Sequence, residues 1–232
     1  MGTTVLVVLV VSGALLLGAA WGLFWPLPRV VEGLLVAMAG GALIVSVTVE
    51  LVEPARLRSG LLVAVVGVLA GALAFVLLDR LVKRRWGTDS GGGLLAAITL
   101  DGVPENLALG VALIAAGPAE VAALAGSIFL SNLPEAAGGA RDMRSSGRGR
   151  RQAFGLWAAT AGLLSAAALA GRIGLEDVGS TPLSAIRCFA AGAVVASLAT
   201  EVFPKAYRED ATWAGAATAA GLVLAVALSA IG

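Results

Sequence analysis

The amino-acid sequence predicts an all-α integral membrane protein with eight transmembrane helices in a single domain, residues 1–232. Hydrophobic residues occupy 59% of the chain and charged residues only 13%, which is more apolar than soluble domains are. Apolar runs long enough to cross a bilayer follow one another with short connections. Because these runs are continuously apolar and do not alternate with period two, the pattern excludes a transmembrane β-barrel.

Eight runs of about 20 mostly apolar residues, the length of a helical span, can be marked along the chain. They cover residues 3–23, 32–52, 60–82, 92–116, 119–140, 153–172, 183–204 and 212–231. Since these spans use nearly the whole chain, no room is left for a soluble catalytic domain, and we expect that the protein is not an enzyme. The formal net charge of +1 gives no basic surface for nucleic acid.

The Lys and Arg residues predict the orientation of the spans. With the N-terminus outside, most of them fall in the connections on the cytoplasmic side, as the positive-inside rule requires. We therefore expect both termini outside, in the cell membrane of a prokaryote, with lipid around the helices. The stretch from Arg141 to Arg151 is expected to be a solvated, orienting loop, and binding of anionic lipid is the alternative.

Spans 32–52 and 183–204 share a spacing of small residues and one glutamate. A shift of 151 positions lays Ala39, Gly41, Ala42, Ser46, Glu50 and Ala55 on Ala190, Gly192, Ala193, Ser197, Glu201 and Ala206. The two spans run in opposite directions, so the match predicts an inverted repeat of the first three spans against the last three, with the fourth and fifth between them. Chance matching of common small residues is the alternative.

Two Pro-Glu motifs lie in the middle of the fourth and fifth spans. They read Asp101-Gly102-Val103-Pro104-Glu105-Asn106 and Ser131-Asn132-Leu133-Pro134-Glu135. Asp101 and Glu105 share one helix face, and Asn132 and Glu135 share another. An ionisable group at this depth marks an ion or substrate path by default. Proline removes a backbone donor inside a helix, so both helices are expected to kink beside their carboxylates.

Facing each other, these side chains would form an all-oxygen ligand set for a divalent cation. The predicted ligands are Asp101, Glu105, Ser131, Asn132 and Glu135. Oxygen ligands suit manganese, iron(II), magnesium or calcium better than zinc, which favours nitrogen and sulfur. The bound ion would be the substrate, and no cofactor is expected. The alternatives are that these groups only stabilise the bundle by pairing, and that each proline is an ordinary kink.

The fourth-span motif resembles that of the ZIP family of divalent metal transporters. The resemblance implies eight spans in a three-two-three arrangement, both termini outside, and a metal site made by H-N-x-P-E-G in the fourth span and H-E-x-P-E-G in the fifth. Pro104 and Glu105 match the first motif, and Asp101 stands at a ligand position usually held by histidine.

In the fifth span Pro134 and Glu135 match, while Ser131 stands for the histidine and Asn132 for the acid beside it. The stretch Val49–Ala55 is similar to the family's acid- and proline-bearing exit from the second helix. The chain departs from the family pattern in having no histidine. Its connection between the third and fourth spans is a short basic stretch, where the family often has a long histidine-rich loop.

The resemblance implies that the chain moves a divalent ion, such as zinc, manganese or iron, by alternating access around a site between the fourth and fifth spans. In the family a four-helix unit that carries the site moves like an elevator against a scaffold. The symmetry of the predicted inverted repeat, and not the resemblance, suggests that Glu50 and Glu201 are intermediate positions on the ion path near opposite membrane surfaces, and ordinary interfacial charges held at helix ends by water are the alternative. Two other classes stay open: a proton-coupled carrier in which the buried glutamates titrate, and a non-transporting membrane sensor or scaffold.

Two small-residue pairs, Gly67/Gly71 and Ala37/Gly41, predict close helix packing. Such packing serves sliding surfaces, a homodimer or simply the interior of the bundle.

Asp101→His should shift ion selectivity toward zinc, because an imidazole nitrogen suits zinc better than manganese or magnesium. The measurement is competition between Mn²⁺ and Zn²⁺ in uptake by proteoliposomes. A wild-type protein that already prefers zinc and cadmium strongly, with no change in the variant, would contradict the expected selectivity.

Overall fold

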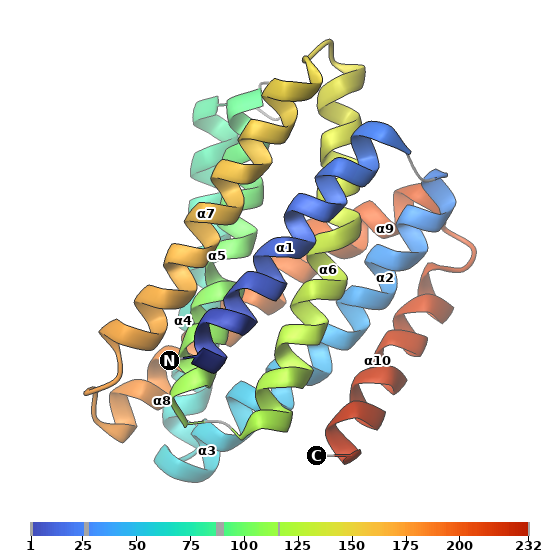
Figure 1. Cartoon of the computed structure of the whole chain (residues 1–232). Helices are drawn as coiled ribbons and strands as arrows, with labels where there is room; N and C mark the ends of the chain where they lie inside the picture. The colour runs from blue at the N-terminus through green and yellow to red at the C-terminus, as the bar shows by residue number, and fades with distance from the viewer. Residues whose placement is uncertain (1, 26–27, 87–90, 116, 232) are drawn as a thin grey trace.

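A computed structural model of the chain describes residues 2–25, 28–86, 91–115 and 117–231. Within these ranges only the backbone is described at positions 86, 91–98, 101, 115, 119, 120, 228, 230 and 231. Every regular element in the described ranges is helical. The elements form a bundle of long helical segments in which successive segments run in alternating directions (Figure 1).

Eight long segments make up the described bundle. Six are single helices: α1 (Gly2–Phe24), α4 (Leu61–Trp86), α5 (Gly91–Ala115), α6 (Pro118–Ser145), α7 (Arg150–Gly174) and α10 (Ala214–Ile231). The other two consist of a long helix, a π-helical turn and a short helix: α2 (Arg29–Ser46), η1 (Val47–Val52) and α3 (Glu53–Ser59), then α8 (Ser180–Ser197), η2 (Leu198–Val202) and α9 (Phe203–Glu209). The segments coincide with the eight expected spans to within a few residues, and position 116 lies outside the described residues.

Five segments are long and apolar enough to cross a membrane. They are Gly2–Phe24, Arg29–Ser59, Leu61–Arg85, Arg150–Gly174 and Ser180–Glu209. The described parts of α5 and α10 hold the shorter apolar helices Gly102–Ile114 and Ala214–Ala227. Large apolar side chains such as Leu9, Leu62 and Leu69 lie exposed on the outside of α1 and α4, where lipid would cover them. The chain is therefore an all-helical membrane protein.

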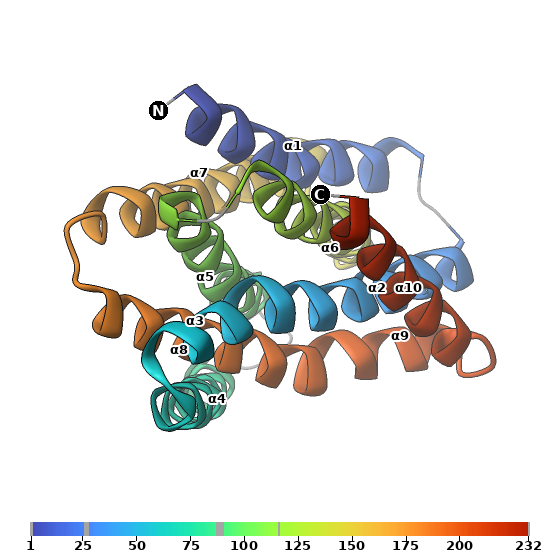
Figure 2. The same cartoon turned by 90° about the horizontal axis from the view of Figure 1, so that it is seen from below.

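The helices pack as two groups of four. In the first group, here called the site unit, α1 packs on α6, α5 on α7 and α1 on α7. In the second, the flanking unit, α4 packs on α8 and α2 on α10, and the short helices join them through contacts of α9 with α2 and of α3 with α8. The units meet where α6 contacts α2 and α5 contacts α8. Figure 2 shows α5 and α6 in the middle of the bundle.

Glycines set the closest approaches within each unit. In the site unit, a Cβ on Gly18 of α1 would overlap the carbonyl oxygen of Leu133 on α6. In the flanking unit, a Cβ on Gly41 would overlap the carbonyl oxygen of Thr218 on α10. The same kind of contact occurs at Gly71 with Phe189, Gly192 with Val68, and Gly110 with Ala168. The predicted close packing is thus confirmed at Gly41 and Gly71, which pack inside the chain.

The two segments matched by the 151-residue shift are built alike. α2 and α8 have 18 residues each and end at the aligned residues Ser46 and Ser197. Each runs into a π-helical turn that holds a glutamate, Glu50 in η1 and Glu201 in η2. Such turns are rare and occur often at functional sites. They were not predicted from the sequence.

Gly41→Ala should lower the free energy of unfolding by about 1–3 kcal/mol, the usual cost of overpacking, because the new methyl group overlaps the backbone of α10. Gly13→Ala is the matched control, since a Cβ there meets nothing within 4 Å. The control should be neutral or gain about 0.5–1 kcal/mol from better helix propensity. Unfolding in detergent measures both, and equal stability of the two variants would contradict the packing described.

Candidate cation pathway

The two Pro-Glu motifs lie on the central helices of the bundle. Pro104 lies inside α5 and Pro134 inside α6, and both helices continue on either side of the proline. α5 and α6 contact each other, and each also contacts the flanking unit. The glutamates that come after the prolines are therefore close to the boundary between the two units.

Glu105 is buried, with 5% of its surface exposed. Beside it lies a narrow void without room for a water molecule, lined by Leu43, Val47, Ala108, Leu124, Ile128 and Val194. Within the described residues no hydrogen bond or ion pair reaches the Glu105 carboxylate. A carboxylate in such surroundings needs a bound cation or a proton to offset the loss of hydration.

The structure brings together only part of the predicted ligand set. Glu135 is half-buried on α6 and close enough to Glu105 for the two carboxylates to interact electrostatically. Ser131 and Asn132 are buried. The Asn132 amide donates to the carbonyl oxygen of Val11 on α1, at 3.4 Å, and so its NH₂ group is directed to α1. The Asp101 side chain lies outside the described residues.

Among the side chains that the structure describes, no group of three or more His, Cys, Asp or Glu residues is placed to hold a metal ion. The five-residue ligand set therefore stays a prediction. What the structure adds is two further neighbours for Glu135, because Glu201 and Lys205 of the flanking unit both lie within its electrostatic reach. Glu135 is therefore a neighbour of Glu105, beside the central void, and of Glu201, in the turn before α9, and these three carboxylates are here called the row.

A buried ion cluster ties the two units together at this end. Glu32 of α2, whose side chain is 2% exposed, pairs with Arg141 of α6 at 2.6 Å and with Lys205 of α9 at 3.3 Å. The carboxylate lies directly on the backbone of Gly138, where a Cβ would overlap one of its oxygens. Because Arg141 belongs to the site unit and the other two residues to the flanking unit, the cluster spans the boundary.

Arg141 corrects a sequence expectation. It does not begin a solvated loop, since α6 continues to Ser145 and the Arg141 side chain is only 18% exposed. The connection to α7 is shorter than expected, and it leaves the arginines from Arg148 onward at the end of the bundle. The buried pairing with Glu32 explains why the helix extends past the apolar span.

The glutamates of the two π-helical turns meet different partners. Glu201 forms an ion pair with Lys83 of α4, which also binds Asp79 at 2.9 Å. Glu50 is 3% exposed, and the Ser229 hydroxyl of α10 donates to it at 3.5 Å. From the sequence, Lys83 and Lys205 were expected only to orient the spans in the membrane. The spacing of four between Asp79 and Lys83 was the one sign that a pair would form on this helix.

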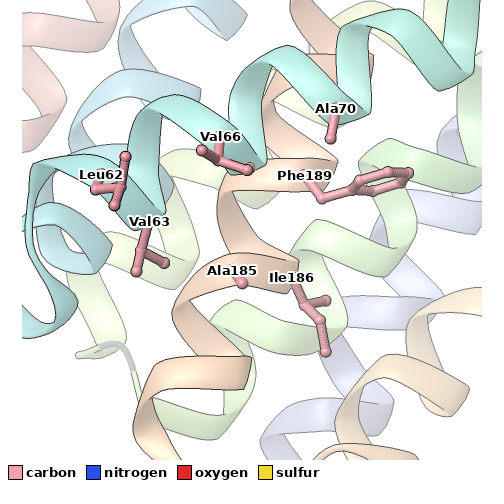
Figure 3. Close-up of a pocket in the computed structure, with 8 residues that line it drawn as sticks. Leu62, Val63, Val66, Ala70, Ala185, Ile186 and Phe189 are labelled. Atoms are coloured by element: carbon pink, nitrogen blue, oxygen red, sulfur yellow. The ribbon is translucent and has the colours of Figure 1, made fainter.

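An open apolar groove lies away from these carboxylates. It runs between α4 and α8, encloses about 520 Å³, and is lined by side chains such as Val66, Ala70, Ile186 and Phe189 (Figure 3). Its wall is almost entirely apolar, so it offers no ligands for an ion and suits contact with lipid chains.

Comparison with models of known protein families and with curated proteins gives no match for this chain. Its function has therefore to be inferred from the residues themselves.

Glu32→Gln should lower the free energy of unfolding by about 2–3 kcal/mol, because it leaves two partly buried cations without their shared, buried carboxylate. The double variant Glu32→Gln/Arg141→Met should recover part of this loss, since fewer buried charges are then uncompensated. Glu53→Gln is the control, because its pair with Arg56 is about half exposed, and its effect should be much smaller. Detergent unfolding of all three tests the cluster, and equal losses in Glu32→Gln and Glu53→Gln would contradict it.

Proposed function

We propose that the protein transports divalent cations across a membrane by alternating access, with a ZIP-like arrangement of eight spans. The observation that carries the proposal is the buried Glu105 carboxylate, which lies beside a void with apolar walls from both units and has the half-buried Glu135 as an electrostatic neighbour. Buried acids inside membrane helices mark ion paths by default.

The pattern of helix contacts supports the three-two-three arrangement. In this arrangement α1 corresponds to α7, α2 to α8, α4 to α10 and α5 to α6. The packed pair α1–α6 then corresponds to the pair α7–α5, and the pair α2–α10 corresponds to the pair α8–α4. All four pairs occur in the structure. The pair α2–α6 likewise becomes α8–α5. An inverted repeat around two central helices gives this kind of symmetry.

The division into two units supports an elevator-like movement of the site unit against the flanking unit. The void beside Glu105 has walls from both units, Leu43, Val47 and Val194 from the flanking unit and Leu124 and Ile128 from the site unit. Movement along this apolar boundary would carry Glu105 and Glu135 between the two membrane surfaces. Glu50 and Glu201, at the boundary's two ends, would be intermediate positions for the ion.

The ligand chemistry favours manganese or iron(II) over zinc, because the chain has no histidine and its candidate ligands are oxygen donors. The basic residues at the end that includes Arg148, Arg150 and Arg208 place that end in the cytoplasm under the positive-inside rule. The termini would then lie outside, as the sequence predicts.

A second candidate function is a proton-coupled carrier of another substrate. It is favoured by the apolar wall around Glu105, which supplies none of the further oxygen ligands that a metal needs. Mn²⁺ uptake into proteoliposomes without a pH gradient supports the first function. Uptake of protons without any response to divalent ions supports the second. Mn²⁺ binding without flux would indicate a sensor.

Glu105→Gln and Glu135→Gln should each abolish Mn²⁺ binding while the protein remains folded, because a divalent ion that has shed water needs anionic ligands. Isothermal titration of the purified variants measures binding, and size-exclusion chromatography checks the fold. Glu53→Gln, which removes a half-exposed carboxylate outside the row, should bind Mn²⁺ like the wild type. Unchanged affinity in both test variants would remove these residues from the site.

A further inference from the structure

We propose that Lys83 is a tethered cation that occupies Glu201 in the ion-free protein and competes there with the transported ion. The proposal deepens the transport function stated above and rests on it. It assigns Lys83 the role of a positioning residue that weakens ion binding at one end of the row and thereby favours release.

The geometry around Lys83 is that of a cation between two acids. Lys83 lies in the last turn of α4, and its ammonium group contacts the carboxylates of Asp79 and Glu201, the first at 2.9 Å. Asp79 is buried, with 8% of its surface exposed. Two carboxylates and one ammonium leave one negative charge, so the place attracts a further cation even while Lys83 is there.

The ammonium also has a partner to retain after it leaves Glu201. Asp79 and Lys83 are four residues apart on the same helix, so their contact depends on α4 alone. An arriving divalent ion can therefore take Glu201 from Lys83 without leaving the lysine buried and uncompensated. The reverse exchange, in which Lys83 returns to Glu201, would expel the ion.

The other π-helical turn provides a comparison within the same chain. In the last turn of α10 the Ser229 hydroxyl, which carries no charge, is one of the groups that meet Glu50. Under the correspondence of helices described above, α10 takes the place of α4. The last turn of α4 thus offers an ammonium group to Glu201, and the last turn of α10 offers a hydroxyl group to Glu50.

The first experiment measures the exchange directly. Reductive methylation of the purified protein, quantified by mass spectrometry, reports how readily the Lys83 ammonium reacts. In the wild type, Mn²⁺ should raise the labelling of Lys83 several-fold. The Glu201→Gln variant should show this higher level of labelling without Mn²⁺, and adding Mn²⁺ to it should have no further effect. If Mn²⁺ is transported by the wild type but leaves Lys83 labelling unchanged, the proposal is overturned and the transport function stands.

The second experiment measures the effect on flux. In oriented proteoliposomes, Lys83→Gln should lower the Mn²⁺ concentration for half-maximal uptake from the Lys83 side about fivefold, because a unit charge at contact distance is worth roughly that factor in surroundings that water reaches. Lys83→Arg should behave like the wild type. The exchange Lys83→Ser/Ser229→Lys should reverse the difference between the two sides. The proposal is overturned if the difference in Mn²⁺ uptake between the two sides is unchanged in both Lys83→Gln and the exchange variant. If the wild type neither transports nor binds Mn²⁺, the transport function is overturned, and this proposal with it.

Discussion

Close contact between glycines and backbone carbonyls is the constraint on which the rest of the bundle depends. In a membrane, burying apolar side chains gives no net gain over lipid, so helices associate through close packing. The contacts described, such as Gly18 with α6 and Gly41 with α10, join helices of the same unit. The boundary between the units is mostly apolar, since Leu43 and Val47 of the flanking unit share one buried cluster with Leu109 and Ile128 of the site unit. It also holds polar and charged contacts, Ser46 with Ser127 at 2.7 Å and the Glu32 cluster. The glycine-to-carbonyl contacts described thus lie within the units, and the boundary is held by side chains.

The buried ion cluster suits such a boundary. Desolvation offsets much of the attraction in a buried ion pair, so the pair adds little net stability while it specifies one arrangement. Glu32 joins Lys205 of its own unit and Arg141 of the other, so the proposed movement of the units would separate Glu32 from Arg141 and leave it paired with Lys205. An apolar contact of the same size would hold the units without distinguishing one position from another.

The sequence predicted the helical segments well because apolar length is a local property. It also predicted that α2 and α8 resemble each other, since small residues and a glutamate recur at the same spacing, and the structure shows two helices of equal length that each lead into a glutamate-bearing turn. The π-helical turns were not predicted, because their backbone hydrogen bonds leave no periodic pattern in a stretch as short as Val47–Val52. The partners of Glu32, Glu135 and Glu201 come from helices far away in the chain, and only tertiary packing brings them together. The Arg141 expectation was wrong for the same reason, since its charge is neutralised from another helix.

The two π-helical turns differ by one residue, six in η1 and five in η2. Glu50 is four positions before Pro54, whereas Glu201 is three positions before Pro204. The long helices before the turns, α2 and α8, are equal in length, and the short helices after the turns have seven residues each. Under the 151-residue shift Glu50 falls on Glu201, whereas Pro54 falls one position after Pro204, so the difference lies between the glutamate and the proline. A π-helical turn accommodates an additional residue without ending the helix, and the short helices beyond the two turns therefore continue their segments alike.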